Sequence, residues 1–443
     1  MKKIISLILL LPLCFSLGSC AFLPENVFGS KKTVLASSAQ KVSVGFDDAK
    51  EENYVAFLDK LDSFAAKLTY EIYADSDKNV NFCISPVSVY MALALATECS
   101  NGETCDEILD AVGVTYDEVK NFTKVLYSFC NREFYYTDLT NARRISAFSE
   151  LANSIWMAED VSFKQDGVNN VANNYNCDLF GVDFDNGEGE RAINKYIKEK
   201  THGLIDGNID LPAETLITLI NTFYLKEVWN EYGDKLDFTN SAYDFKNADG
   251  NSTSIKLLKG YYNKGNVYSG DGYTSFFTTT EHGYKLHFIL PTDENSLEDI
   301  FTSENIYNII NISDYGYVDH ENKLLHNTRV FFPEYEASYD GDIKNILRND
   351  FGINKLFDIE ECDFSNIINT AVACDGVIHK CNLNVNARGI EGAAVTVMPN
   401  AGAAGPGEYK EVYHDYIVDR AFGFVIIDSY GAVLFSGVIN SIA

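Results

Sequence analysis

Three residues of types that often do chemistry stand in separate, mostly apolar segments: Ser85, Asn221 and His379. A serine and a histidine could pair as nucleophile and base. However, the chain has no nucleophile motif such as G-x-S-x-G, and no third member of a triad can be identified. A hydroxyl, an amide and an imidazole can also satisfy one another's hydrogen bonds when they are buried. We therefore predict a structural polar cluster and not the active site of an enzyme.

The cysteines and histidines give no metal-ligand pattern. The sequence has 10 cysteines and 7 histidines but no C-x-x-C, H-x-H or H-E-x-x-H, so we expect no metal and no cofactor. Cys14 is expected to leave with an export signal and Cys20 to be modified. The remaining cysteines favour buried free thiols, with disulfides left open; they are Cys83, Cys99, Cys105, Cys130, Cys177, Cys362, Cys374 and Cys381.

The composition indicates a compact acidic protein. Of the 443 residues, 46% are hydrophobic and 13% are aromatic, which is enough to form a large core. The formal net charge is -29, and Lys and Arg form no cluster beyond the extreme N-terminus. Phosphate backbones are bound by clustered Lys and Arg, so the composition argues against binding of nucleic acid.

Residues 1–20, MKKIISLILLLPLCFSLGSC, have the features of an export signal: a basic start, a short apolar stretch and small residues before a cysteine. Leu17-Gly18-Ser19-Cys20 resembles the bacterial lipobox. We therefore expect a signal peptide at 1–19 and a lipid on Cys20 that anchors the protein in the membrane at the cell surface. A plain secretory signal is the alternative, because the glycine is less usual at its place. Residues 20–50 are polar and predict a flexible tether.

Helical and strand-like periodicities are distributed unevenly along the chain. Apolar residues spaced by three and four predict a first helix: Leu58, Leu61, Ala65, Leu68 and Ile72. A second helix is expected at SPVSVYMALALATEC, where Ser85 can cap the end and Pro86 fits the first turn. Strand-like runs occupy 216–225, 285–291, 328–335, 422–428 and 432–439. Helices concentrate early and strands late, which predicts an α+β fold with antiparallel sheets.

The segment GIEGAAVTVMPNAGAAGPGE, residues 389–408, carries only two charges, Glu391 and Glu408. Its Gly and Pro clusters are typical of a surface loop. The first half nevertheless alternates like a strand and contains the run Val395-Thr396-Val397. From these residues alone the segment is compatible with either structure.

Six segments in order resemble motifs of the serpin family, from about residue 53 to the C-terminus. They are NFCISPVSVYMALALA, INKYIKEKTHGLI, LINTFYLKEVW, FFPEYEASYDGDIKNIL with FGINKLF, VIHKCNLNVNARGIEGAAVTV, and DYIVDRAFGFVIID with LFSGVIN. Tyr196 stands where the family usually has Trp, and Glu227 where it usually has Gly. The resemblance implies one serpin domain at 51–443, with three β-sheets, eight or nine helices and an exposed reactive-centre loop at about 387–415.

In that family a serine protease cuts the loop, and the cut loop enters the main sheet as an extra strand while the protease is still attached as an acyl-enzyme. The resemblance implies the same suicide inhibition here, by a monomer. Small, uncharged, alternating residues suit a segment that is first a loop and then a central strand. In that strand Ile390, Gly392 and Ala394 would face the core, and Glu391 would face the other side.

The resemblance also assigns site residues. They are the hinge residues Gly389, Ile390, Glu391, Gly392, Ala393 and Ala394, the shutter residues Ser85, Asn221 and His379, and the breach residue Trp229, where insertion begins. Counting from the hinge glycine places the cleaved bond between Ala403 and Ala404. Small residues suit shallow apolar specificity pockets, so elastase-like or subtilisin-like serine proteases are the expected partners. A bond at Tyr409 or Lys410 is the alternative, with chymotrypsin-like or trypsin-like targets.

The hinge departs from the family pattern at three positions: Ala387 replaces Glu, Ile390 replaces Thr and Gly392 replaces Ala. Ile390 is apolar and can be buried, whereas Gly392 fits sterically but costs backbone entropy. We expect inhibition to survive these changes. The alternative is a non-inhibitory surface lipoprotein of the same fold, used for binding or adhesion, whose loop is only a substrate.

Overall fold

The computed structural model describes residues 32–37, 51–137, 140, 142–205, 208–209, 211, 215–229, 235–390 and 409–442. The expected signal peptide at 1–19, Cys20, the hinge residues Glu391, Gly392, Ala393 and Ala394, and the expected cleavage site at Ala403 and Ala404 lie outside the described residues. The predictions made for them therefore stay predictions.

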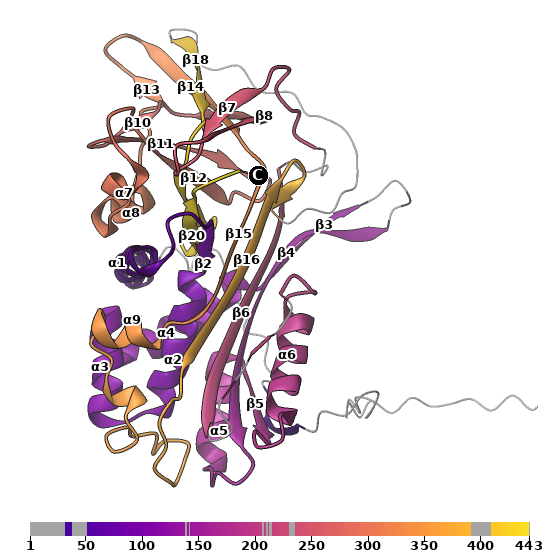
Figure 1. Cartoon of the computed structure of the whole chain (residues 1–443), viewed down its shortest axis with the longest axis vertical. Coiled ribbons are helices and arrows are strands. Elements are labelled where there is room, and N and C mark those ends of the chain that lie inside the picture. The colour runs from indigo at the N-terminus through magenta and orange to yellow at the C-terminus, as the bar shows by residue number, and fades with distance from the viewer. Residues whose placement is uncertain are drawn as a thin grey trace, which may run out of the picture.

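An 8-stranded sheet, called the large sheet below, runs along most of the molecule (Figure 1). Its strands in spatial order are β1 (Thr33–Ala36), β5 (Cys177–Val182), β4 (Arg143–Ala158), β6 (Ile217–Val228), β17 (Gly389–Ile390), β16 (Val377–Asn386) and β15 (Tyr335–Asp342), with β3 (Arg132–Thr137) beside β4. The pairs β4–β5 and β6–β16 are parallel. The expectation of antiparallel sheets is wrong for these pairs: the helix α5 (Gln165–Tyr175) returns the chain to the same end between β4 and β5, and a long run of other strands and helices does so between β6 and β16.

Three smaller sheets contain the other strands of the described chain. A 6-stranded sheet has the order β10 (Tyr268–Ser269), β11 (Tyr273–Thr279), β12 (Lys285–Pro291), β19 (Phe422–Ile427), β20 (Val433–Ile439) and β2 (Phe82–Ile84). A 4-stranded sheet contains β13 (Val318–Asp319), β14 (Leu324–Phe332), β18 (Lys410–Ile417) and β9 (Leu258–Lys264), and β7 (Tyr243–Lys246) pairs with β8 (Ser252–Ile255). The run EYEASYDGD, which belongs to one of the six segments that resemble serpin motifs, contains edge strand β15 of the large sheet.

Helices cover both faces of the large sheet (Figure 1). Besides α5 they are α1 (Glu52–Asp75), α2 (Pro86–Cys99), α3 (Gly102–Val112), α4 (Tyr116–Cys130), α6 (Glu188–Lys200), α7 (Leu297–Ile300), α8 (Ser303–Ile310) and α9 (Lys344–Asn349). In Figure 1, α6 lies on one side of the sheet and α2, α4 and α9 lie on the other. The predicted α+β class is confirmed. Among the described helices, none is both long and apolar enough to cross a membrane.

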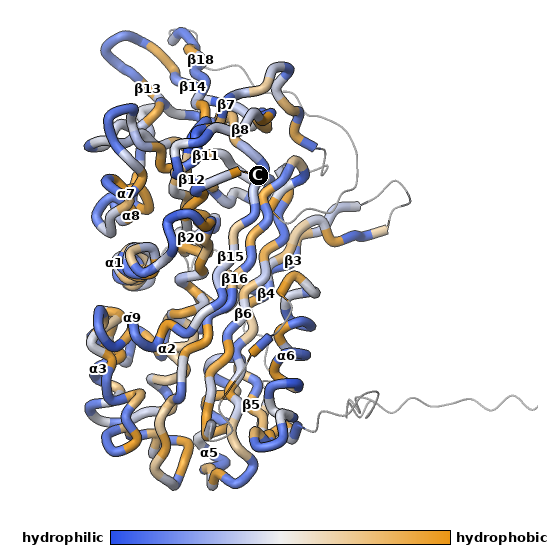
Figure 2. The backbone as a smooth tube through the Cα atoms, in the orientation of Figure 1, coloured by the Kyte–Doolittle hydropathy of each residue, from blue (hydrophilic) through white to orange (hydrophobic). Residues whose placement is uncertain are grey.

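Alternate residues of the central strands supply two separate cores. On β4, Leu151 and Ile155 belong to the larger core, whereas Trp156 belongs to a smaller core beneath α6. The Trp156 ring packs edge-on against Tyr196 of α6 at 5.6 Å between ring centroids. Figure 2 shows hydrophobic residues along β6 and β20 and hydrophilic residues at the outer loops. The large sheet is therefore buried on both faces, as an additional central strand would also be.

The two predicted helices are present, and α2 begins where its sequence predicts. The apolar stripe of α1 is buried as expected, from Leu58 to Ile72. Nearly all of α2 is buried, which is typical of a helix that is apolar all round. Ser85 is the N-cap residue of α2 and Pro86 its first residue, but the Ser85 side chain makes no capping hydrogen bond.

Part of the segment predicted as a tether forms a strand. Within residues 20–50 the structure describes 32–37, and Thr33–Ala36 pairs as β1 with β5 at the edge of the large sheet. The Lys32 ammonium lies 4.1 Å from the centroid of the Phe180 ring, and the Ser37 hydroxyl donates to Asp178 Oδ1 at 2.6 Å. The short run TVLA carries the β-branched and apolar residues that a polar tether would lack.

Candidate functional site

The first hinge residues already lie inside the large sheet. Gly389 and Ile390 form β17, which pairs antiparallel with β16 on one side and with β6 on the other. Ile390 lies opposite Val385 of β16 and Glu227 of β6, and its side chain is 0% exposed. The prediction that Ile390 can be buried in the sheet therefore agrees with its position in the uncut chain.

The two strands that flank β17 meet directly at their opposite ends. Val377 of β16 pairs with Leu219 of β6, and Ile378 pairs with Ile220. The same register, continued toward the C-terminal ends of both strands, would place Val385 opposite Glu227. In the structure β17 lies between these two residues. The strands β6 and β16 are thus closed at one end and opened at the other by two residues of the hinge, as a sheet that can accept one more strand requires.

Gly389 is required for the close approach of β17 to β6. A Cβ atom added at Gly389 would lie 1.9 Å from the carbonyl oxygen of Glu227, which no side chain tolerates. The sequence assigned this glycine to the hinge by resemblance, and its contact with Glu227 is the physical reason that only glycine fits.

We expect Gly389→Ala to expel β17 from the large sheet, because the new methyl group and the Glu227 carbonyl cannot occupy the same space. The backbone amides of β17 should then exchange with solvent at least about tenfold faster, which corresponds to about 1.4 kcal/mol of local stability. Hydrogen exchange read by mass spectrometry on the peptide that spans 385–390 measures this. Gly341→Ala on edge strand β15 is the control, and equal exchange in both variants would contradict the expectation.

Trp229 holds the turn between β16 and β17. Its Nε1–H donates to the carbonyl oxygen of Asn386 at 2.7 Å, and its ring packs edge-on against Phe332 at 5.4 Å between centroids. Ala387, which follows Asn386 in the chain, is held by two backbone hydrogen bonds. Its N–H donates to Glu334 Oε1 and its carbonyl accepts from the Leu236 N–H, each at 2.7 Å. The sequence placed Trp229 where insertion begins, and the structure puts it in contact with the hinge turn.

Glu227, which stands where the family usually has glycine, is fully buried beside the hinge. Its carboxylate lies 3.0 Å from Nδ1 of His282, and the His282 ring stacks on Phe134 of β3 at 3.9 Å between centroids. A buried carboxyl group without a hydrogen-bond partner is destabilising, and the His282 ring nitrogen is the partner of Glu227. The sequence pointed to Glu227 only as a departure and gave no signal for His282.

The predicted shutter residues lie in one region but do not all contact one another. The backbone N–H of Ser85, at the start of α2, donates to His379 Nε2 of β16 at 3.1 Å. The hydroxyl of Ser85 is buried without a hydrogen-bond partner, so a Ser-His catalytic pair is absent from this site. Burial lowers the pKa of His379 to about 4, which keeps the imidazole neutral and its Nε2 free to accept.

Asn221 bonds to two residues that sequence reasoning missed. Its side-chain carbonyl accepts from the Ser88 hydroxyl of α2, and its amide donates to the side-chain carbonyl of Asn153 on β4. Asn153 in turn donates to the carbonyl oxygen of Tyr175 at 2.8 Å. These bonds join α2, β6 and β4 across the large sheet. Ser88 lies in the predicted helix, but Asn153 belongs to no motif, so only the pairing of β4 with β6 reveals it.

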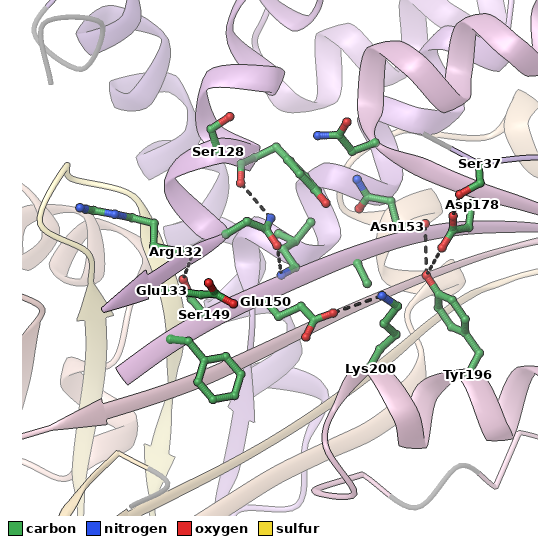
Figure 3. A pocket seen from close by; sticks show the side chains of 16 residues that line it. Ser37, Ser128, Arg132, Glu133, Ser149, Glu150, Asn153, Asp178, Tyr196 and Lys200 are labelled. Atoms are coloured by element: carbon green, nitrogen blue, oxygen red, sulfur yellow. Dashed lines mark hydrogen bonds and ion pairs between the residues drawn. The ribbon is translucent and has the colours of Figure 1, made fainter. Parts of the chain in front are cut away.

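A cavity of about 690 Å³ lies at the edge of β4, next to this polar cluster (Figure 3). Figure 3 shows Glu150 paired with Lys200 of α6, at 3.1 Å between Oε1 and Nζ, and Tyr196 directed at Asp178. Asn153 belongs both to the cavity wall and to the polar cluster.

Within the described chain, no group of three or more His, Cys, Asp or Glu side chains is arranged to hold a metal ion. The eight cysteines that follow Cys20 are all free thiols, six of them buried. The expectation of buried free thiols therefore agrees with the structure for most of them, and Cys105 and Cys362 are only partly buried.

Known proteins with similar sequences and structures belong to one family. The family model described as Serpin (serine protease inhibitor) matches residues 59–442. Iripin-1 of Ixodes ricinus is 27% identical over 398 residues, which are 86% of this chain and 93% of that protein. The native state of tengpin, a thermophilic serpin, has a TM-score of 0.67 at 21% identity over 92% of this chain and 97% of that one. Serpin48, a highly specific serpin of the insect Tenebrio molitor, has a TM-score of 0.70 at 21% identity over 89% and 99%.

The chain belongs to the serpin family, and the predicted serpin fold is confirmed. Members of this family are generally inhibitors of serine proteases.

Proposed function

We propose that this protein is a suicide inhibitor of serine proteases that traps its target by inserting the cut loop between β6 and β16. The observation that carries the proposal is the position of β17, whose two residues occupy the top of the site that the loop would fill. The family and the alternating sequence of 389–398, in which Glu391 is the one charge, support it.

The trapping reaction begins as ordinary proteolysis. The protease serine attacks the carbonyl carbon of Ala403, forms an ester with it and releases the chain that begins at Ala404. Insertion of the loop below Ile390 then competes with hydrolysis of this ester. A strand of about fifteen residues would carry the protease about 50 Å along the sheet, where compression disorders its oxyanion hole.

The register of β17 predicts where the inserted loop would lie. Ile390 is opposite Glu227 and Val385, so six residues further along an antiparallel strand Thr396 would lie opposite Asn221 and His379. Residues opposite one another share a face of the sheet, so the Thr396 hydroxyl would reach the predicted shutter. The loop thus offers a small polar residue at the one level where the neighbouring strands carry a buried amide and an imidazole.

The position of Lys410 supports a bond earlier in the loop. Lys410 begins β18 and pairs with Leu324 of β14, and its N–H donates to the carbonyl oxygen of Lys323 at 2.9 Å. The Tyr409 hydroxyl lies 2.9 Å from His320 Nδ1. A protease needs a free extended backbone at the cleaved bond, which favours Ala403–Ala404 over the alternative at Tyr409 or Lys410. Elastase-like or subtilisin-like proteases are therefore the proposed targets.

Mixing the purified protein with pancreatic elastase and with subtilisin tests the proposal. We expect a complex that survives SDS and boiling. We also expect a C-terminal fragment whose mass matches a chain that begins at Ala404. Elastase with an alkylated or otherwise blocked active-site serine is the control, because it cannot form the ester. Clipped protein without any complex, across a panel of serine proteases, would overturn trapping.

A non-inhibitory serpin whose loop is only a substrate is the alternative, favoured by the unusual hinge residues Ala387 and Gly392. Thermal denaturation after clipping separates the two functions. Insertion adds roughly a dozen hydrogen bonds at about 1 kcal/mol each and should raise the midpoint steeply. A loop that stays outside the sheet should leave the midpoint unchanged.

We also propose that a lipid on Cys20 holds the protein at the cell surface, because residues 1–20 resemble a lipoprotein export signal. Cys20→Ser should release the protein from the membrane fraction without changing its inhibition. Metabolic labelling with a radioactive fatty acid should mark the unaltered chain and not the variant. Labelling that persists in Cys20→Ser would contradict the assignment.

A further inference from the structure

Two buried cysteines from distant parts of the chain meet where β16 of the large sheet packs against β2 of the 6-stranded sheet. The Sγ atoms of Cys83 and Cys381 lie 3.1 Å apart, about 1 Å more than the length of an S–S bond. Cys83 is 0% exposed and Cys381 is 5% exposed. Both are free thiols in this structure. Their sulfur atoms therefore need only a small shift to reach bonding distance.

The backbone around the pair is held in place by other contacts. Cys83 lies in β2, which pairs with β20 in the 6-stranded sheet, and Cys381 lies in β16 of the large sheet. Two residues further along one segment and two residues back along the other, the Ser85 N–H donates to His379 Nε2. The same two segments are thus joined twice, once through sulfur and once through the predicted shutter. This second contact keeps the thiols facing each other without a covalent bond.

We propose that Cys83 and Cys381 are a redox-active pair that forms a disulfide linking β2 to β16. The reaction needs an oxidant, which we assign to a low-molecular-weight disulfide such as glutathione disulfide. The thiolate of one cysteine attacks a sulfur of the oxidant, which releases one half of the oxidant as a thiol and leaves the other half bound as a mixed disulfide. The thiolate of the second cysteine then displaces that bound half as a thiol. Two protein thiols are thus oxidised and one disulfide is reduced to two thiols.

The environment of the pair determines when oxidation occurs. Burial, followed by the contact with Cys381, raises the pKa of the Cys83 thiol well above its usual range, so little thiolate is present in the folded protein. Oxidation is therefore slow once the core has closed and faster while the chain folds. An exported chain folds where disulfides persist, which is the compartment that residues 1–20 predict.

The bond would stabilise one wall of the insertion site and leave the other free. Cys381 lies on β16, and the loop would enter between β16 and β6. Linking β16 to β2 fixes this wall to the 6-stranded sheet, while β6 keeps its freedom to separate from β16. The oxidised form should therefore be more stable before cleavage and should still accept the loop.

The test compares the protein refolded in glutathione disulfide with the same protein refolded in dithiothreitol. We expect the oxidised form to lose two alkylatable thiols and to yield a peptide pair that contains Cys83 and Cys381 after non-reducing digestion. Its thermal midpoint should rise by about 5 °C, because the bond closes a very long loop in the unfolded chain. Unfolding the oxidised protein in dithiothreitol and refolding it should reverse both changes.

Matched variants make the assignment specific. Cys83→Ala and Cys381→Ala should each abolish the rise in the midpoint, whereas Cys130→Ala, which removes another buried thiol, should keep it. The comparison of oxidised and reduced unaltered protein needs no variant to fold. A full complement of thiols after oxidative refolding, a peptide pair from other cysteines, or a rise that persists in Cys83→Ala would each overturn the proposal. None of these readouts depends on protease inhibition, so failure of the proposed function leaves the test intact.

Discussion

Replacing Ile390 with glutamate should convert the protein from an inhibitor into a substrate. Ile390 is fully buried between Val385 and Glu227, and directly opposite residues on neighbouring strands have Cβ atoms about 5 Å apart. The new carboxylate would therefore be desolvated and would face the buried side chain of Glu227. His282 already binds Glu227, so it would not be available to the new carboxylate. Desolvation of an ion costs several kcal/mol. Insertion should slow much more than ester hydrolysis.

We expect the ratio of covalent complex to clipped product to fall at least about 100-fold in Ile390→Glu, since about 2.7 kcal/mol in the insertion barrier already gives that factor. Gel densitometry of the reaction with elastase measures the ratio. The cleavage rate of the loop should stay the same, because the bond at Ala403 is remote from the hinge. Ile390→Val, which removes one methylene, is the matched control and should still form complex. Full trapping by Ile390→Glu would show that β17 is not where insertion starts.

The sequence predicted the large features of the fold because they rest on periodicity. The stripe of α1 and the alternating runs of β12, β19 and β20 lie within a residue or two of their expected bounds. The stripe of α1 is buried, and β12, β19 and β20 are buried on both faces, as mostly apolar runs indicate. The parallel pairs were missed because periodicity within a strand contains no information about the direction of its neighbour.

The polar cluster shows why residue types alone cannot fix a site. Ser85, Asn221 and His379 were predicted to form one structural polar cluster, and the structure buries all three but bonds Asn221 to Ser88 and Asn153 instead. The hydroxyl of Ser85 is nevertheless not the group that His379 binds, because the backbone N–H at the start of α2 points to the imidazole. Which of two donors on one residue faces a partner depends on the backbone direction at the helix start. That direction is fixed by tertiary packing.

The strand β1 was missed for a different reason. Residues 20–50 are polar on average, and a four-residue run such as Thr33–Ala36 is too short to stand out from that average. It becomes a strand because β5 leaves an open edge of the large sheet, whose backbone groups need partners. The signal for β1 therefore lies on β5 and not in the segment itself.

Acid should destabilise the uncut protein through His379. Burial lowers the pKa of His379 to about 4 in the folded chain, against an ordinary value of about 6.5 when unfolded. Between these two values the unfolded chain binds the proton and the folded chain does not, so stability falls as pH decreases from 6.5 to 4. The difference of about 2.5 pH units corresponds to about 3 kcal/mol. Above pH 6.5 both forms are neutral and this contribution is constant.

The variant His379→Gln isolates this effect, because an amide carbonyl can still accept from the Ser85 N–H and does not titrate. Unfolding by urea at pH 7 and pH 4 should show that the unaltered protein loses about 3 kcal/mol more than the variant. Other buried groups titrate in both proteins and cancel in this difference: burial also lowers the pKa of His287, to about 3, and raises that of Asp62 and Asp428, to about 8 and about 6. Exposed His202, paired with Glu150, supplies the control variant His202→Gln.

Protonation of His379 would also convert its Nε2 from an acceptor into a donor that faces the Ser85 N–H, so the contact between α2 and β16 would be lost. Because β16 forms one wall of the insertion site, the acid-weakened protein should open β6 from β16 more readily. Clipped protein incubated at pH 4.5 should then complete its rise in heat stability faster than at pH 7, and His379→Gln should show no such acceleration. Equal pH dependence in the two proteins would mean that His379 does not control the closure of the sheet.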